Sequence, residues 1–422
     1  MQVLVLGAGV VGVTTAYFLA TRGHKVTVID RQPSAAQETS LANGGQLSYT
    51  HAQPWANPAV LPKALKWMFH EDAPLIFRFQ PDPYMISWGI RFLRNCTTAR
   101  AHHNAEQILK LGLYSKKMLA LVASGTQVEF DHLEKGVLHI FNDPKEFEGA
   151  KAVAEFERGL GSADRIISGE EALALEPSLQ HAKRKIIGGI HHTLDESGDV
   201  HLFTTGLAEY CAKLGVEFLY GTEVRSIARQ GKRIAAVKTS KGDFTADAYV
   251  MSFASHSAPV LRSIGISVPV YPMKGYSITL PIAGSNAAPM ISITDDAKKI
   301  VYSRLGNRLR AAGTAEFAGY NSEITPVRSD AILNAAKELF PQAGDFSKVE
   351  RWMGLRPATP DGVPIIGRTE YDNLFLNTGH GTLGWTLSCG SARVLADIME
   401  EKTPEIPVEG LSAARFHALP FM

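Results

Sequence analysis

Apolar residues near the start of the chain form one long run, VLVLGAGVVGVTTAYFLA over residues 3–20, which contains no charged side chain. Its length would suit a helix that crosses a membrane. Glycines interrupt the run, however, no basic segment precedes it, and no cleavage site of the signal-peptide type follows it. The pattern therefore predicts a buried strand over residues 2–6, a tight turn, and a helix that packs on a sheet.

The glycines in this run, GAGVVG, have the G-x-G-x-x-G spacing of a dinucleotide-binding turn. Gly7 permits the sharp turn, Gly9 lets a pyrophosphate approach the backbone, and Gly12 allows close packing of helix on strand. A second predicted strand, KVTVID, ends in Asp30, whose carboxylate can accept hydrogen bonds from ribose hydroxyls. We expect a dinucleotide here, with its phosphates at the helix N-terminus.

A second glycine loop, GHGTLG at residues 379–384, lies almost a whole chain length away. A predicted strand over residues 373–378 precedes it, and a predicted helix over residues 385–401 follows it. No strand with a terminal acid continues the pattern, so this loop is no second dinucleotide-binding unit. Its backbone N–H groups and the positive end of the helix dipole would still stabilise a ligand that gains electron density, such as a reduced, anionic flavin.

Other segments have the apolar patterning of shorter elements. A helix followed by a strand is predicted over residues 201–227, a strand within residues 246–258, and further strands over residues 136–141, 276–282 and 308–317.

Composition narrows the class of protein. A chain of 422 residues that is 45% hydrophobic is long for a single core, so two domains are expected. Lys plus Arg total 43 against 42 Asp plus Glu, which leaves no basic field to attract nucleic acid. The three cysteines lie far apart without metal-ligand spacing, so we expect no metal centre, no disulfide framework and a reducing, cytoplasmic location.

Five segments together resemble the FAD-dependent D-amino-acid oxidase superfamily, and within it the bacterial dehydrogenases most closely. These segments, in the family's order, are GAGVVG with Asp30, SLANGGQLS (40–48), YPMKGYS (271–277), GLRPATPDGVPIIGR (354–368) and NTGHGTLGWT (377–386). The resemblance implies an α/β protein with a discontinuous, Rossmann-like FAD-binding domain and an inserted α+β substrate domain built on an antiparallel sheet. The FAD domain would comprise residues 1–50, 201–258 and 350–422, and the substrate domain residues 51–200 and 259–349.

The resemblance also implies catalytic residues. Arg356 matches the family position whose arginine binds the substrate carboxylate, which a guanidinium does with two parallel donors. The alternative is an arginine that pairs with a nearby Asp or caps a turn. Lys274 and Tyr276 match the active-site wall, although an alternating strand would as readily place the lysine in solvent and the tyrosine in the core.

The remaining matched positions would contact FAD. They are Gly7, Gly9, Val10, Val11, Gly12, Asp30, Arg31, Ser40, Asn43, Gly45, Gln46, Val224, Ala254, Gly381, Thr382, Leu383, Gly384, Trp385 and Thr386. Val224 matches a position whose backbone meets adenine, and the residues from Ser40 to Gln46 match a segment at the flavin ring. A polar surface loop is the alternative for that segment, and Thr382 could also cap the helix. His380 is expected to be a loop residue and not a base.

The implied activity is oxidative deamination of D-amino acids such as D-alanine to 2-oxo acids and ammonia, with hydride transfer to the flavin and a quinone as electron acceptor. Three alternatives stay open. One is an oxidase of glycine, sarcosine or proline-type secondary amines that uses oxygen. The others are an NAD-dependent dehydrogenase and a flavin or dinucleotide binder without catalysis.

Residues 54–95 hold three of the five tryptophans among phenylalanines, lysines and arginines. Such a mixture can dock on an anionic membrane surface. The same residues can instead pack the substrate domain, which we favour because exposed apolar clusters are rare. The resemblance favours peripheral contact with the cell membrane, since such dehydrogenases pass electrons to the respiratory chain there.

Overall fold

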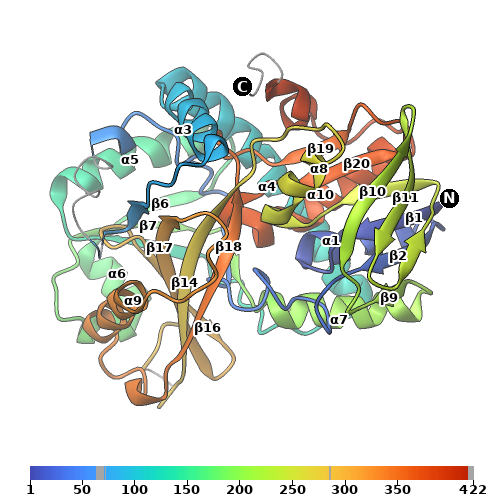
Figure 1. Ribbon diagram of the computed structural model, residues 1–422. Helices are drawn as coiled ribbons and strands as arrows, with labels where there is room; N and C mark the ends of the chain where they lie inside the picture. Colours follow the sequence, from blue (N-terminus) through green and yellow to red (C-terminus); the bar gives the residue numbers. More distant parts are fainter. Residues whose placement is uncertain (63–70, 72, 285–286, 417–422) are drawn as a thin grey trace.

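The computed structural model describes residues 1–62, 71, 73–284 and 287–416, and their two largest sheets lie side by side (Figure 1). The first sheet has six strands in the order β19-β20-β13-β1-β2-β9. β1 pairs in parallel with both β2 and β13. Its strands are β1 (Gln2–Leu6), β2 (Lys25–Ile29), β9 (Glu217–Leu219), β13 (Ala248–Met251), β19 (Ile365–Arg368) and β20 (Leu374–Thr378).

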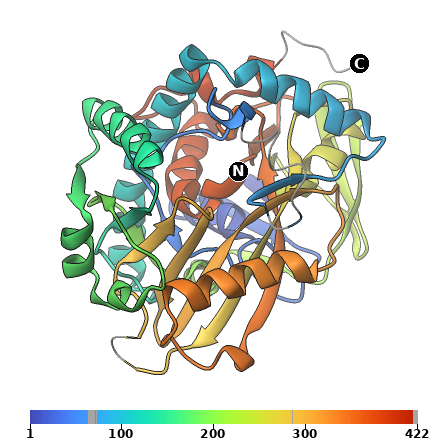
Figure 2. The ribbon, with the colours of Figure 1, turned by 90° about the vertical axis from the view of Figure 1, so that its left-hand side faces the viewer.

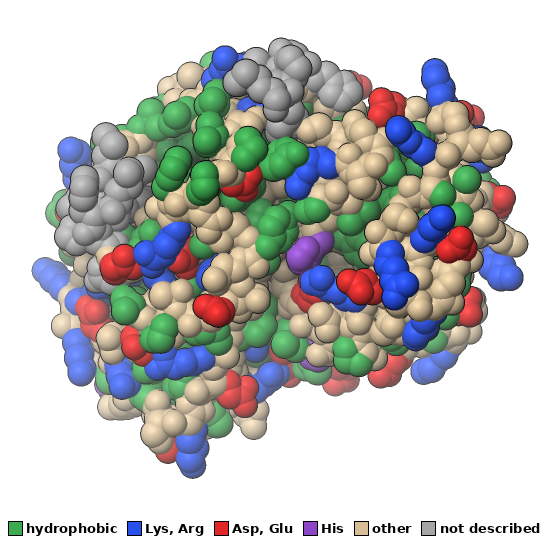
Figure 3. Space-filling model, in the orientation of Figure 1, with side chains coloured by type: hydrophobic (Ala, Val, Ile, Leu, Met, Phe, Trp, Pro, Cys, Tyr) green, Lys and Arg blue, Asp and Glu red, His purple; other side chains and the backbone are tan. Residues whose placement is uncertain are grey.

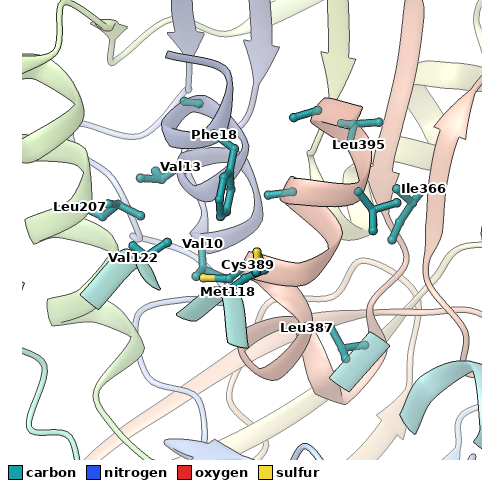
Figure 4. Close-up of a cluster of buried hydrophobic side chains, with 14 of the residues drawn as sticks. Val10, Val13, Phe18, Met118, Val122, Leu207, Ile366, Leu387, Cys389 and Leu395 are labelled. Carbon is teal, nitrogen blue, oxygen red and sulfur yellow. The ribbon is translucent and has the colours of Figure 1, made fainter. Parts of the chain in front are cut away.

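Both faces of this sheet are covered, which explains why β1 is apolar without alternation. Val3 and Val5 face the core formed by helices α1 (Val10–Ala20), α4 (Thr98–Thr126), α7 (Val200–Lys213) and α10 (Gly384–Met399). Figure 4 shows side chains of these helices meeting in that core. Leu4 and Leu6 face the opposite core, beneath the small sheet of β10 (Val224–Gln230), β11 (Arg233–Thr239) and β12 (Gly242–Phe244).

The second sheet is mainly antiparallel, in the order β18-β14-β17-β16-β15-β5-β7-β6, with β4 beside β17. Its strands are β4 (Leu75–Phe77), β5 (Val137–Phe141), β6 (Asp164–Ser168), β7 (Gly188–His192), β14 (Tyr271–Pro281), β15 (Ser292–Asp295), β16 (Ile300–Leu305), β17 (Arg308–Phe317) and β18 (Glu350–Ala358). Helix α9 (Pro326–Leu339) crosses one face of this sheet (Figure 2), where Ile332 and Leu339 pack against Ile278 and Leu280.

Several of the connecting helices begin at residues that cap a helix N-terminus. Asp82 and Asp143 each cap a helix whose first residue is proline, and Ser168 forms a capping box with Glu171. The connecting helices and strands are α3 (Pro83–Asn95), α5 (Pro144–Gly159), α6 (Gly169–Leu175), α8 (Ser257–Arg262), β3 (Gln46–Leu47) and β8 (Glu196–Ser197). Within the described residues, no helix is long and apolar enough to cross a membrane.

The predicted fold class is confirmed: a Rossmann-like α/β unit stands beside an α+β unit built on an antiparallel sheet. The division of the chain into predicted segments stays a proposal, and two elements cross it. β18 pairs with β14 in the antiparallel sheet although it begins the predicted FAD segment 350–422. Helix α4 comes from the predicted substrate segment 51–200 but packs against α10.

Candidate functional site

The predicted dinucleotide turn opens into a cavity of about 200 Å³. Asp30 lies at the end of β2, and its carboxylate accepts hydrogen bonds from the backbone N–H groups of Ala8 (2.7 Å) and Gln32 (2.8 Å). Burial nevertheless raises the pKa of Asp30. Beside it, the guanidinium of Arg31 pairs with Glu38 at 2.6 Å. The predicted residues that line this cavity are Gly7, Gly9, Asp30, Arg31, Ser40, Val224 and Ala254.

A larger cavity of about 290 Å³ continues the groove, because both cavities share Gly9, Ser40, Ser252 and Ala254. The hydroxyl of Ser252 lies buried between them without a hydrogen-bond partner among the described residues. The predicted residues that line the larger cavity are Gly9, Val10, Val11, Ser40, Asn43, Gly45, Gln46, Ala254, Tyr276, Arg356, Gly381, Thr382, Leu383, Gly384, Trp385 and Thr386. The structure thus brings together the glycine turns from the two ends of the chain.

The second glycine loop forms a single 3₁₀ turn (Gly381–Leu383) that leads directly into α10. No side chain of the described residues caps this helix, and Thr382 is not its N-cap. The Thr386 hydroxyl instead accepts a hydrogen bond from the backbone N–H of Ser48, at 3.1 Å, which joins the loop to the 40–48 segment. The first turn of α10 therefore presents uncapped N–H groups at the cavity wall, where negative charge is favoured.

Arg356 lies on β18 opposite Met273 of β14, and its side chain lines the larger cavity. One terminal nitrogen donates to the Thr314 carbonyl at 2.9 Å. Burial lowers the pKa of Arg356 to about 10, which keeps the guanidinium charged near neutral pH. Among the described residues, no carboxylate lies within ion-pair distance of it, so the alternative of a structural Arg–Asp pair has no support. The remaining donors are left for an anionic ligand.

The absence of a side chain at Gly275 makes room for this guanidinium. A Cβ atom at Gly275 would lie 2.2 Å from Cζ of Arg356. We expect Gly275→Ala to fold and to bind FAD, because the obstructing group is the end of a flexible side chain. The displaced guanidinium should lower kcat/KM by about 10- to 100-fold, as expected when a positioned charged contact is weakened.

The measurement is steady-state kinetics together with the flavin absorbance spectrum. Gly89→Ala is the matched control, since no atom lies within 4 Å of the added Cβ there. Unchanged kinetics in Gly275→Ala would mean that the guanidinium need not lie over β14.

Lys274 and Tyr276 differ from the prediction in what their polar groups contact. The ammonium of Lys274 is buried and donates to Asn321 Oδ1 (2.8 Å) and the Glu323 carbonyl (3.1 Å), and the residue does not line the cavity. Tyr276 lines the cavity, but its hydroxyl donates to Glu316. Their assigned catalytic roles stay predictions that this geometry does not favour.

Gly12 also lines neither cavity. A Cβ at this position would lie 1.8 Å from the Gly7 carbonyl oxygen, so its role is close packing of α1 on the turn. Sequence reasoning missed other cavity residues, because they come from distant strands and loops that carry no local motif. Among them are His51, His139, Thr294, Asp296, Lys299, Thr314 and Trp352.

His380 precedes the 3₁₀ turn and is fully buried, with Nε2 3.0 Å from the Ser391 hydroxyl. Burial lowers its pKa to about 3 from the usual 6.5. The folded protein therefore holds a neutral imidazole where the unfolded chain, between pH 6.5 and 3, holds a proton. Stability must fall as the pH is lowered through this window.

We expect His380→Gln to reduce this acid-dependent loss. Between pH 7 and pH 4.5 the free energy of unfolding of the wild type should fall by about 2–3 kcal/mol more than that of His380→Gln. This figure follows from the imidazole pKa of 6.5 in the unfolded chain and about 3 in the folded protein. Denaturant unfolding of both proteins at several pH values measures it. Parallel stability curves for the two proteins would contradict the neutral, buried imidazole.

Comparisons with known proteins agree with this geometry. The family model described as "FAD dependent oxidoreductase" matches residues 2–398. The chain is 49% identical to a D-amino acid dehydrogenase of Dechloromonas aromatica (strain RCB), over 96% of this chain and 98% of the relative. It is 48% identical to a D-amino acid dehydrogenase of Paramagnetospirillum magneticum, over 99% of both chains.

Solved structures share the fold. Glycine oxidase from Geobacillus kaustophilus matches with a TM-score of 0.77 at 21% identity, over 98% of this chain and 99% of that one. L-proline dehydrogenase from P. horikoshii matches with a TM-score of 0.76 at 20% identity, over 99% and 98%. At this identity the likeness concerns the fold alone.

The residues present fit FAD. The two cavities form one continuous groove, with Asp30 at the end where the ribose would bind and the uncapped N-terminus of α10 at the other end. Glycines line the groove where FAD would come close to the backbone. Buried polar atoms that lack partners within the described residues, Ser252 Oγ and Trp385 Nε1, belong to residues of its wall. With the family match over residues 2–398, the chain belongs to the FAD-dependent oxidoreductase family and uses FAD as its cofactor.

Proposed function

We propose that this oxidoreductase is a D-amino acid dehydrogenase, which oxidises a free D-amino acid such as D-alanine to the imino acid. Water then converts the imino acid to a 2-oxo acid and ammonia. The observation that carries the proposal is Arg356, a guanidinium in the wall of the larger cavity without an ion-pair partner among the described residues. The names of the two relatives that match nearly the whole chain support it.

Each group of the chain has a distinct task in this reaction. Arg356 binds the substrate carboxylate with two parallel donors and so fixes the direction of the Cα–H bond. The Thr314 carbonyl holds the guanidinium at 2.9 Å, so little freedom is lost on binding. Bound FAD supplies the two-electron acceptor. The first turn of α10 stabilises negative charge at its end of the cavity.

No base is assigned to His380. Its pKa of about 3 makes the imidazole a poor proton acceptor near neutral pH, and Nε2 already contacts Ser391. If the amine of the substrate enters the cavity neutral, the reaction needs no base and the chain needs to supply only orientation.

An anaerobic screen of amino acids tests the proposal. The purified yellow enzyme is mixed with D-alanine, L-alanine, glycine, sarcosine and proline, and loss of flavin absorbance near 450 nm is followed. We expect bleaching by D-alanine and none by L-alanine. Bleaching by glycine, sarcosine or proline alone would favour the amine-oxidase alternative, and a flavin that no amino acid reduces would favour a binder without catalysis.

We further propose a quinone as the electron acceptor. A small apolar cavity adjoins the flavin loop, since Gly381, Thr382 and Leu383 form one of its walls. Aromatic and aliphatic side chains form most of the rest, among them Trp55, Phe77, Trp88, Phe92, Met273 and Phe317. An apolar ring system with few polar partners suits such a pocket.

Helix α3 lies over this cavity and has two apolar faces. Trp88 and Phe92 are buried in the cluster beneath it, so the packing interpretation of residues 54–95 holds for this part. On the other face Ile86, Ile90 and Leu93 are 45–58% exposed, and Figure 3 shows hydrophobic side chains gathered in this region. Trp67, in the same segment, lies outside the described residues. The exposed face supports a proposed peripheral contact with the cytoplasmic side of a membrane.

Replacing Ile86 and Leu93 together by Asp tests this contact. We expect the variant to lose most of its cosedimentation with anionic lipid vesicles, because two charges replace apolar surface that would enter the interface. Reduction of a long-chain quinone in vesicles should fall, whereas reduction of a soluble short-chain quinone should not. Leu214→Asp, at a 45% exposed leucine after α7, is the control. Equal vesicle binding by all three proteins would contradict the contact.

A further inference from the structure

Three histidines from separate parts of the chain form a cluster, and two of them, His51 and His139, line the larger cavity. His51 follows β3, His139 lies on β5, and His192 lies on the neighbouring strand β7. The register pairs His139 with Ile190, so His139 and His192 project from the same face of the two strands. Ring centroids are 4.5 Å apart for His51 and His139, 4.7 Å for His139 and His192, and 5.6 Å for His51 and His192. One ring nitrogen of each lies within 4.8 Å of the other two.

Buried carboxylates hold two of these rings in a defined tautomer. His139 Nδ1 lies 2.7 Å from Asp296, and His192 Nδ1 lies 2.7 Å from Asp164. A neutral imidazole that donates its Nδ1–H to a carboxylate keeps the lone pair on Nε2. This carboxylate–imidazole arrangement is the one that supports metal-ligating histidines in proteins.

Three buried carboxyl groups lie beside the histidines. Glu157, Asp164 and Asp195 are each at most 4% exposed, and within the described residues none of them pairs with a lysine or arginine. Glu157 Oε2 and Asp195 Oδ2 have no hydrogen-bond partner there. Lys299 also lines the cavity, and its ammonium group forms an ion pair with Asp296, with Nζ 2.5 Å from Oδ1. A buried group of carboxylates without a fixed counter-cation is costly unless protons or a metal ion offset it.

We propose that His51, His139 and His192 bind a divalent transition-metal ion of the Zn²⁺ class. Ligand nitrogens of a tetrahedral zinc site lie about 3.3 Å apart, given Zn–N bonds of about 2.0 Å. Because the present nitrogens lie within 4.8 Å of one another, the rings would have to rotate to close the site. Three protein ligands leave a fourth position, and it would face the cavity because His51 and His139 line the cavity wall. Metal binding here would not depend on which amino acid the enzyme oxidises.

The test is a Zn²⁺ titration of the FAD-loaded enzyme against a chromophoric chelator, after removal of endogenous metal. We expect one tight site per chain. Asp164→Asn, which removes an outer-shell partner, should weaken it by roughly 10- to 100-fold. His139→Gln and His192→Gln should weaken it further. His191→Gln is the matched control, because this neighbour on β7 instead lies 3.0 Å from the Lys135 carbonyl.

Flavin absorbance and thermal unfolding show whether each variant is folded. If a variant on a strand does not fold, His51→Gln, in a loop, is used in its place. Zn²⁺ should also raise the Tm of the wild type but not of the ligand variants. The absence of a stoichiometric site in the wild type would overturn the proposal. So would equal Zn²⁺ affinity in the wild type and the ligand variants.

Discussion

Replacing Arg356 by Ala should lower kcat/KM for D-alanine by about 10³-fold while the protein stays yellow. The estimate follows from the loss of two charge-assisted hydrogen bonds of roughly 1.5–3 kcal/mol each. The side chain lines the larger cavity and does not line the smaller cavity that holds Asp30, so FAD binding should survive. Stopped-flow reduction of the flavin by D-alanine, compared with the wild type, measures the effect.

Two further variants separate the shape of the guanidinium from its charge. Arg356→Lys keeps the charge but loses the paired donors, so its kcat/KM should lie between those of the wild type and Arg356→Ala. Arg351→Ala is the control on the same strand, because Arg351 pairs with Asp330 at 2.6 Å and does not line the cavity. Wild-type kinetics in Arg356→Ala would remove the main support for the proposed function.

The sequence predicted the parts of the site that local chemistry determines. A strand, a glycine turn and a helix form one continuous segment, so the spacing of Gly7, Gly9 and Gly12 was enough to identify the turn. The second loop was likewise visible as a strand followed by glycines and a helix. The segment 40–48 and the position of Arg356 required the family resemblance, since neither has a distinctive local pattern.

Other features depend on pairings that no local pattern specifies. A two-residue alternation places Lys274 and Tyr276 on one face of β14, but it does not say what covers that face. The structure covers it with Glu316 and Asn321, which hold both polar groups away from the cavity. Sheet membership of β18 is set by its pairing with β14, which no local pattern near residue 350 specifies.

The histidine cluster is the clearest case. The expectation of no metal centre came from the three cysteines, and His51, His139 and His192 lack the short spacing of a metal-binding motif that would have changed it. They meet only because β5 pairs with β7 and because the loop after β3 brings His51 against both rings. Clusters assembled by register across a sheet need the fold before they can be recognised.

Gly12→Ala should abolish FAD binding. The added Cβ would lie 1.8 Å from the Gly7 carbonyl oxygen and 2.9 Å from its carbon, both of them backbone atoms. Backbone cannot rotate aside, so α1 would have to move away from β1 by more than an ångström. That movement would disturb the turn that Gly7 and Gly9 form and would loosen the core beneath α1. We expect colourless protein with a lowered Tm, measured by flavin absorbance and calorimetry.

Gly9→Ala separates an effect on FAD binding from an effect on folding. At Gly9 the nearest protein atom to an added Cβ is Ser40 Oγ at 3.5 Å, an ordinary contact, and φ is −73°. The apoprotein should therefore keep its Tm, and FAD affinity should still fall because the methyl group points into the groove. Gly23→Ala, strained by its φ of +81° but distant from the groove, should cost about 1 kcal/mol and stay yellow. If Gly9→Ala bound FAD as tightly as the wild type, the pyrophosphate would not approach the backbone at this turn.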